Sequence, residues 1–265
     1  MTKIKIISGW SNPGGSTTAF INLCNLFNEN GLDCTYYGPH PYHLGQCVSN
    51  MLEQCVINDE DEILITHFFK IPHRPEKSKK VILACHEKEV FPIRDIKPHW
   101  DEIVYVAESQ KDWQGFPGTV IPNVLTDITV TKKETSSNIA GIIGSIDRNK
   151  NTHISIKRAL EDNCDKVLLF GIVTDNSYWE TTVKPLIDGT KVIFNGYIQN
   201  RDEMYSSIDV VYQSSDSECA SLTSQECKSL GIEFKGNENI EEVKSLISNS
   251  EIFEKWMKVL DHDNW

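Results

Sequence analysis

Residues 4–38 read IKIISGWSNPGGSTTAFINLCNLFNENGLDCTYYG, and this stretch decides the fold class. It begins with an apolar run followed by a Gly-rich turn. Apolar residues then recur at helical spacing from Phe20 to Phe27, and Gly31 ends the pattern. A second strand-like run, CTYYG, follows at once. Strand, loop, helix and strand in this order are typical of a parallel sheet covered by helices.

The same alternation continues along the chain. Buried strands are predicted at 62–66, 79–85 and 102–107, and a polar stretch, 131–138, then resembles a linker. Beyond it, strands are predicted at 139–145, 166–172, 191–197 and 209–215, and helices at 151–162, 179–188, 200–208 and 222–230. We therefore predict an α/β protein with two Rossmann-like lobes that face each other across a cleft. The first lobe would span residues 1–125. The second would span residues 126–265 and end in a helical tail, and the two would be joined near residues 123–138.

Composition excludes several classes of protein. The net charge of −12 argues against nucleic-acid binding, which needs clustered Lys and Arg. The 8 cysteines form no CxxC pair, so no structural zinc site is predicted. The sequence shows neither a signal peptide nor an apolar run long enough to span a bilayer, so we expect a reduced, cytoplasmic protein without a transmembrane segment. The basic cluster at 70–80 is expected to be a solvated loop, with weak contact to a membrane or an anionic acceptor as the alternative.

Polar and glycine residues follow the predicted strands of the second lobe. Because the carboxyl ends of parallel strands meet at one edge, and helix N-termini lie there too, these residues are candidates for ligand binding. An anion would find cations in Arg148 and Lys150, and free backbone N–H groups at residues 221–223. The candidates are Ser145, Asp147, Arg148, Lys150, Gly171, Gly196, Tyr197, Glu218, Ser221 and Leu222.

Several segments together resemble one enzyme family. The opening strand, glycine loop and helix, the segment VIPNV, the loop IGSIDRNKN and the run VIFNGYIQNRDEMYSSIDVVYQSSDSE occur in the order seen in retaining glycosyltransferases of the GT-B fold. Glu218 and Glu226 then reproduce that family's spacing of two glutamates with seven residues between them. The family transfers a sugar from a nucleotide diphosphate sugar and needs no metal and no cofactor. The resemblance therefore implies a nucleotide-sugar donor such as a UDP-sugar, and a glycan, lipid-linked or small-molecule acceptor.

The resemblance also assigns roles to residues. Glu226 would accept hydrogen bonds from the ribose hydroxyls, and Glu218 would face the donor sugar. The amides near Ser221 and Leu222 would hold the diphosphate, and Lys150 would stabilise the charge on the leaving group. Residues at the strand ends of the first lobe would complete the site: Gly14 and Gly15 would admit the diphosphate close to the backbone, and His86, with His67 as the weaker candidate, would lie near the sugar and the acceptor.

Two departures from the family keep an alternative open. Ser145 stands where the family has arginine, with Arg148 as a possible substitute, and the chain is short for two such lobes. A binding protein that holds a nucleotide sugar or glycan without turnover is therefore the alternative function. A nucleotide-sugar epimerase is a weaker one. A nicotinamide dehydrogenase is poorer still, because SGWSNPGGS lacks the G-x-G-x-x-G spacing and no acidic residue follows the second strand.

Overall fold

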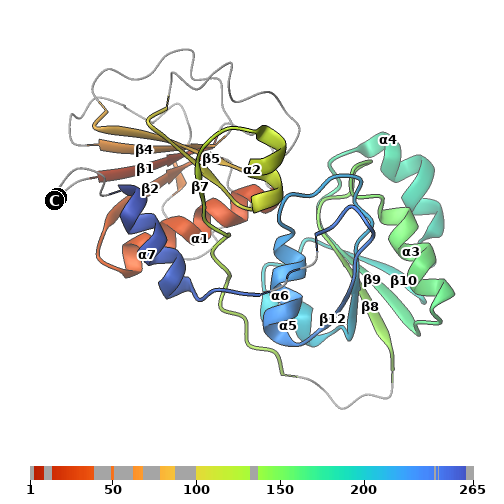
Figure 1. Ribbon diagram of the computed structural model, residues 1–265. Coiled ribbons are helices and arrows are strands. Elements are labelled where there is room, and N and C mark those ends of the chain that lie inside the picture. The colour runs from red at the N-terminus through yellow and green to blue at the C-terminus, as the bar shows by residue number, and fades with distance from the viewer. Residues whose placement is uncertain are drawn as a thin grey trace. The chain divides into compact units, whose positions relative to one another are not determined.

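The structure of the chain is a computed structural model, and it describes residues 3–8, 14–38, 49–50, 62–67, 78–86, 100–131, 137–241, 243 and 245–260. The chain divides into two units. The first comprises Met1–Leu125 together with Ile247–Trp265, and the second comprises Thr126–Leu246. Each unit has its own parallel sheet and its own helices (Figure 1). The predicted α/β fold with two parallel-sheet lobes is confirmed.

The first unit contains a seven-stranded sheet in the order β3-β2-β1-β4-β5-β6-β7. All of its paired strands are parallel. All six residues of β4 are buried, as expected for a central strand with both faces covered. The elements are β1 (Lys3–Ile7), α1 (Gly15–Glu29), β2 (Asp33–Tyr37), β3 (Ser49–Asn50), β4 (Glu62–His67), β5 (Lys80–Cys85), β6 (Glu102–Tyr105), α2 (Glu108–Gln114), β7 (Thr119–Val120) and α7 (Asn249–Leu260).

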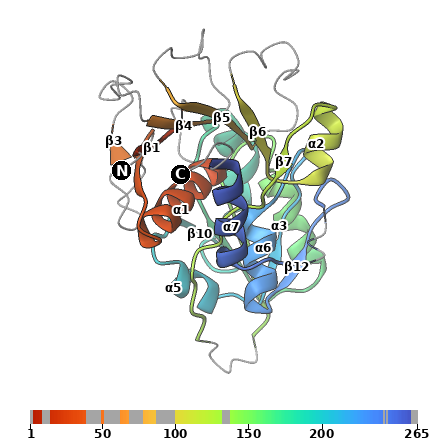
Figure 2. The same cartoon turned by 60° about the vertical axis from the view of Figure 1, so that its left-hand side comes forward.

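The C-terminal helix α7 belongs to the first unit, whereas the sequence predicted that the helical tail would belong to the second lobe. Its Trp256 meets Phe27 of α1 edge to face, with ring centroids 5.8 Å apart, and α7 lies beside α1 in both views (Figure 1, Figure 2). The Asn249 side chain also pairs with the backbone of Leu125, accepting from its N–H at 3.2 Å and donating to its carbonyl at 2.9 Å. Burial of the apolar face of α7 on α1 is the physical reason for this placement.

The second unit contains a five-stranded parallel sheet in the order β10-β9-β8-β11-β12. Helix α3 packs on one face, through Ile156 and Ala159, and α5 and α6 pack on the other, through Tyr205 and Cys227. The predicted helix at 179–188 is a π-helical turn followed by a 3₁₀ turn, because Pro185 lacks the N–H that an α-helix would use. The elements are β8 (Ile139–Ile143), α3 (Thr152–Glu161), β9 (Lys166–Phe170), α4 (Asn176–Tyr178), β10 (Val192–Gly196), α5 (Arg201–Ser206), β11 (Val210–Tyr212), α6 (Leu222–Leu230) and β12 (Glu233–Lys235).

Candidate functional site

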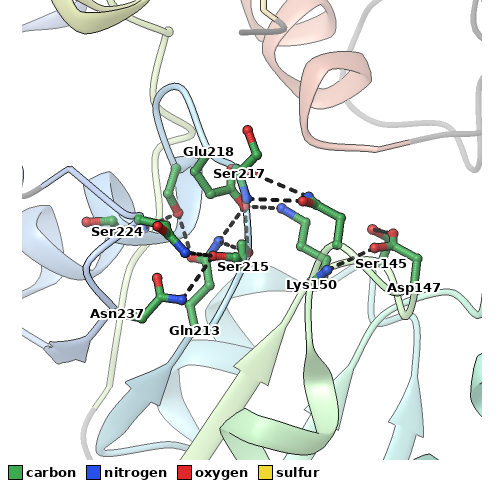
Figure 3. A network of polar contacts seen from close by, with 12 residues as sticks. Ser145, Asp147, Lys150, Gln213, Ser215, Ser217, Glu218, Ser224 and Asn237 are labelled. Carbon is green, nitrogen blue, oxygen red and sulfur yellow. Dashed lines mark hydrogen bonds and ion pairs between the residues drawn. The ribbon is translucent and has the colours of Figure 1, made fainter. Parts of the chain in front are cut away.

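The order of strands in the second sheet marks one place for a ligand. The chain leaves β8 toward β9 on one side, while β11 lies on the other side of β8. In open α/β sheets, ligands bind outside the carboxyl ends of the strands at such a point of reversal. The loop after β8, residues 144–151, and the loop after β11, residues 213–221, meet here and carry the polar network shown in Figure 3.

The side-chain amide of Asn149 joins the two loops, because it bonds both the N–H and the carbonyl of Ser217. Its side chain accepts from the N–H of Ser217 at 3.1 Å and donates to the Ser217 carbonyl at 3.2 Å. The Asn149 carbonyl accepts from the N–H of Asp216 at 2.8 Å, and Asn151 donates to the Asp216 carboxylate at 2.6 Å. Four hydrogen bonds therefore fix the distance between the two loops that bear Lys150 and Glu218.

Glu218 is held through one of its two carboxylate oxygens. Its Oε1 accepts from Gln213 Nε2 at 2.6 Å and from Ser215 Oγ at 2.9 Å, and it forms an ion pair with Lys150 Nζ (Figure 3). Within the described residues, Oε2 has no hydrogen-bond donor, and the side chain is 14% exposed. The carboxylate is thus anchored at one oxygen and leaves the other for a ligand.

The start of α6 lies beside this carboxylate. The Ser221 hydroxyl caps the helix by accepting from the Ser224 N–H at 3.1 Å. The N–H groups of Leu222 and Thr223 have no acceptor in the described part of the chain, as is usual in the first turn of a helix. The start of α6 is linked to the Lys150 ammonium through Gln213 and Glu218. Free amides, the positive end of the helix dipole and this cation favour phosphate.

Glu226 is also held through one oxygen. Its Oε2 accepts from Arg201 Nη2 at 2.8 Å and from the Tyr205 hydroxyl at 2.6 Å. Its Oε1 is buried and has no hydrogen-bond partner among the described residues, and the side chain is only 1% exposed. Burial raises the pKa of the Glu226 carboxyl, while the Arg201 guanidinium opposes that shift. An orphan buried oxygen is costly, so a donor from a bound ligand would relieve it.

The other residues of the loop after β8 are engaged within the protein. The Ser145 hydroxyl donates to Asp147 Oδ2 at 2.6 Å, and the other oxygen of Asp147 accepts from the Lys150 N–H at 3.0 Å. Arg148 pairs with Asp175 at 3.1 Å and lies over the Tyr178 ring. The structure therefore brings Ser145, Lys150 and Glu218 together in one region, whereas the described contacts of Arg148 are with other residues.

The glycines at the ends of the strands of the second unit are required by the local backbone. A Cβ on Gly171 would lie 1.7 Å from the Gly144 carbonyl oxygen, so no larger residue fits there. Gly144 and Gly196 have positive φ angles of 140° and 69°, which L-residues with side chains rarely adopt. Tyr197 is half-buried directly after β10. The conformations of these glycines are thus explained by the loops themselves.

In the first unit, two histidines lie together at the carboxyl ends of β4 and β5. The His67 and His86 ring centroids are 5.6 Å apart, and Phe20 of α1 contacts both rings. The Ser8 hydroxyl, just after β1, lies 3.2 Å from His67 Nδ1. Burial, and next the neighbouring His67, lower the pKa of the His86 imidazole well below its ordinary value. His86 is therefore neutral at pH 7.

Gly14 and Gly15 begin α1, and a Cβ on either would meet nothing within 4 Å. Neither has a positive φ, so the described contacts of the first unit do not demand glycine at these positions.

Of the basic cluster at 70–80, residues 70–77 lie outside the described residues. Among the residues that are described, no group of three or more metal-ligating side chains occurs. The helices within the described ranges include none with the length and hydrophobicity that a membrane span requires.

Sequence reasoning missed several residues that hold the two glutamates, among them Asn149, Gln213 and Ser215 near Glu218, and Arg201 and Tyr205 on Glu226. Asn149 and Arg201 lie in polar stretches where nothing distinguishes them from solvated side chains. Gln213 gives a faint signal, because an amide at the end of an apolar strand needs a hydrogen-bond partner when buried.

Comparison with known proteins gives matches in structure alone. No family model matches the sequence. No curated protein matches it either. AviGT4, a glycosyltransferase involved in avilamycin A biosynthesis, is 15% identical with a TM-score of 0.64, and the match covers 96% of this chain and 88% of that one. A glycosyltransferase from Rickettsia africae ESF-5 is 13% identical with a TM-score of 0.68, covering 97% and 88%. HepE from Anabaena, in complex with UDP and glucose, is 13% identical with a TM-score of 0.63, covering 98% and 90%. The chain therefore has the two-domain fold of the GT-B glycosyltransferases along nearly its whole length.

Proposed function

We propose that the protein is a glycosyltransferase that moves a sugar from a nucleotide diphosphate sugar to an acceptor, with retention of configuration and without a metal ion. One observation carries the proposal. Glu218 and Glu226 each bind the protein through one carboxylate oxygen and leave the other without a donor in the described residues. Along the chain, Glu218 precedes and Glu226 follows the free amides at the start of α6. A nucleotide sugar has a matching order of groups, with sugar hydroxyls, then the diphosphate, then the ribose hydroxyls.

Each group would have a distinct role. Glu218 Oε2 would accept from a hydroxyl of the donor sugar, and Glu226 Oε1 from a ribose hydroxyl. Because Glu226 is 1% exposed, the ribose contact requires a small rearrangement beside Arg201, whose side chain is 22% exposed. The amides of Leu222 and Thr223 would bind the diphosphate, in place of a metal ion.

Lys150 would act in the chemical step. In the free protein its ammonium pairs with Glu218. As the bond between sugar and diphosphate breaks, negative charge grows on the leaving group, and a fixed cation stabilises it most at that moment.

A transfer assay tests the proposal. Parent protein is incubated in EDTA with UDP-, GDP- and ADP-hexoses and a panel of simple glycoside and alcohol acceptors, and the anomeric proton of the product is read by NMR. We expect transfer from one donor, with the donor's anomeric configuration in the product. Inverted products would refute retention, and a requirement for added Mg²⁺ or Mn²⁺ would refute metal independence. Binding of a nucleotide sugar without transfer or hydrolysis would support a binding protein of the same fold.

A further inference from the structure

Gln213 occupies the centre of the polar network after β11. It is 6% exposed, and its amide bonds in three directions. Nε2 donates to Glu218 Oε1 at 2.6 Å and to Ser215 Oγ at 3.1 Å, while Oε1 accepts from Ser221 Oγ at 2.7 Å (Figure 3). This buried amide therefore has every one of its hydrogens and one lone pair of its oxygen in use.

The orientation of the amide follows from its two neighbours, the Glu218 carboxylate and the Ser221 hydroxyl that caps α6. Ser221 Oγ accepts from the Ser224 N–H, so its own proton is free to be donated, and Gln213 Oε1 receives it. The carboxylate oxygen Oε1 of Glu218, which pairs with Lys150, only accepts, so the amide nitrogen faces Glu218 and the amide oxygen faces Ser221. A donor is thus fixed against the carboxylate by the start of the neighbouring helix.

The backbone at Gln213 is held independently of its side chain. Arg158 of α3 donates through Nη1 to the Gln213 carbonyl at 3.2 Å and to Ser214 Oγ at 3.0 Å. Its Nη2 donates to the Gly236 carbonyl at 2.9 Å. A change to the Gln213 side chain should therefore leave the path of the loop in place.

We propose that Gln213 is a positioning residue that sets the direction of the Glu218 carboxylate. Glutamate has three rotatable side-chain bonds, and a single anchored oxygen limits them only if its donors are themselves fixed. Lys150 is a flexible donor that a bound diphosphate would compete for, whereas Gln213 and Ser215 are fixed. When a nucleotide sugar draws Lys150 toward the phosphates, Gln213 and Ser215 would keep Glu218 Oε2 facing the sugar. This inference rests on the proposed function.

The experiment compares two ligands that differ only in the sugar. Affinities for a nucleoside diphosphate and for its hexose conjugate are measured by calorimetry, after a panel of UDP, GDP and ADP sugars identifies the bound nucleotide. Gln213→Met keeps most of the side-chain volume and removes both hydrogen-bonding groups. Gln225→Met is the control, because Gln225 is equally buried at 6% and, within the described part of the chain, its side chain bonds only the carbonyl of Ser221, at 3.4 Å.

We expect Gln213→Met to weaken binding of the nucleotide sugar roughly 10-fold and binding of the diphosphate less than about 3-fold, as for one lost hydrogen bond to a charged group. Gln225→Met should change neither. In a Glu218→Ala background, Gln213→Met should have little further effect on sugar binding, because the group it positions is gone.

Four results would overturn the inference. Equal losses for both ligands, together with a lowered melting temperature, would show that Gln213 only supports the loop. Additive losses in the double variant would show that it does not act through Glu218. Unchanged affinities for both ligands would leave the proposed function standing and remove Gln213 from it. A parent protein that binds no nucleotide sugar would remove both.

Discussion

Lys150→Met should slow sugar transfer far more than it weakens donor binding. In the free protein Lys150 pairs with Glu218, and the two side chains are 26% and 14% exposed. After the substitution Glu218 keeps its bonds from Gln213 and Ser215, so no buried charge is left without a donor. We expect the free energy of unfolding to fall by about 1–2 kcal/mol, in the range of one partly exposed hydrogen bond to a charged group.

The effect on the chemical step should be larger. A fixed cation contributes most where charge develops, so removal of Lys150 should reduce kcat by about 10²–10³-fold. In the bound donor, less negative charge lies on the oxygen between sugar and diphosphate than in the transition state. The affinity for the donor should therefore weaken by roughly 10-fold or less. The assay is single-turnover transfer or donor hydrolysis alongside calorimetric titration of the same donor, for the parent, Lys150→Met and Lys157→Met. Lys157 is an exposed lysine of α3 and serves as the matched control.

Two results would refute this reasoning. If Lys150→Met retains the turnover of the parent, Lys150 has no role in the departure of the leaving group. If turnover and affinity fall by the same factor, Lys150 contributes uniform binding and does not favour the transition state.

Three further predictions address other parts of the structure. Glu226→Gln should weaken nucleoside diphosphate binding by roughly 10-fold in calorimetry, because the ribose hydroxyls lose a carboxyl oxygen as acceptor; parental affinity would exclude Glu226 from the site. Trp256→Ala should destabilise the first unit by about 3–5 kcal/mol in urea unfolding, because it empties the contact between α7 and Phe27, and an effect below about 1 kcal/mol would contradict that packing. Because the pKa of His86 is lowered in the folded protein, the unfolded chain binds the proton first as the pH falls below about 6.5. Lowering the pH from 7.5 to 5.5 should therefore reduce the free energy of unfolding of the parent by about 1 kcal/mol more than that of His86→Gln. Equal pH dependence of the two proteins would show that His86 protonates in the folded state.

The fold could be predicted from the sequence because its signals are local. The six residues of β4 form an unbroken buried run, and α1 repeats its apolar residues with helical period between turn residues. The alternation of such segments leaves few arrangements other than parallel sheets covered by helices. The sequence around α7 does not indicate the unit on which this helix packs. Its apolar stripe shows that it must pack on something, but only the pairing of Asn249 with Leu125 and of Trp256 with Phe27 selects the first unit.

The candidate site could be predicted in outline and not in detail. Lys150 and Glu218 follow strands that turn out to be neighbours at the point where the strand order reverses, and that position is inherent in the α/β pattern. The direction of each side chain depends on contacts with segments that are distant in the sequence. Arg148 pairs with Asp175, which is 27 residues later in the sequence, and Glu226 pairs with Arg201, which is 25 residues earlier. Sequence spacing carries no information on such contacts.

A crystal structure of the protein with a bound nucleoside diphosphate, grown in EDTA, tests the central claim most directly. The account predicts diphosphate oxygens within hydrogen-bond distance of Lys150 Nζ and of the N–H groups of Leu222 and Thr223, with a ribose hydroxyl on Glu226 Oε1. A nucleotide bound away from the carboxyl ends of β8 and β11, or no bound nucleotide at millimolar concentration, would contradict it.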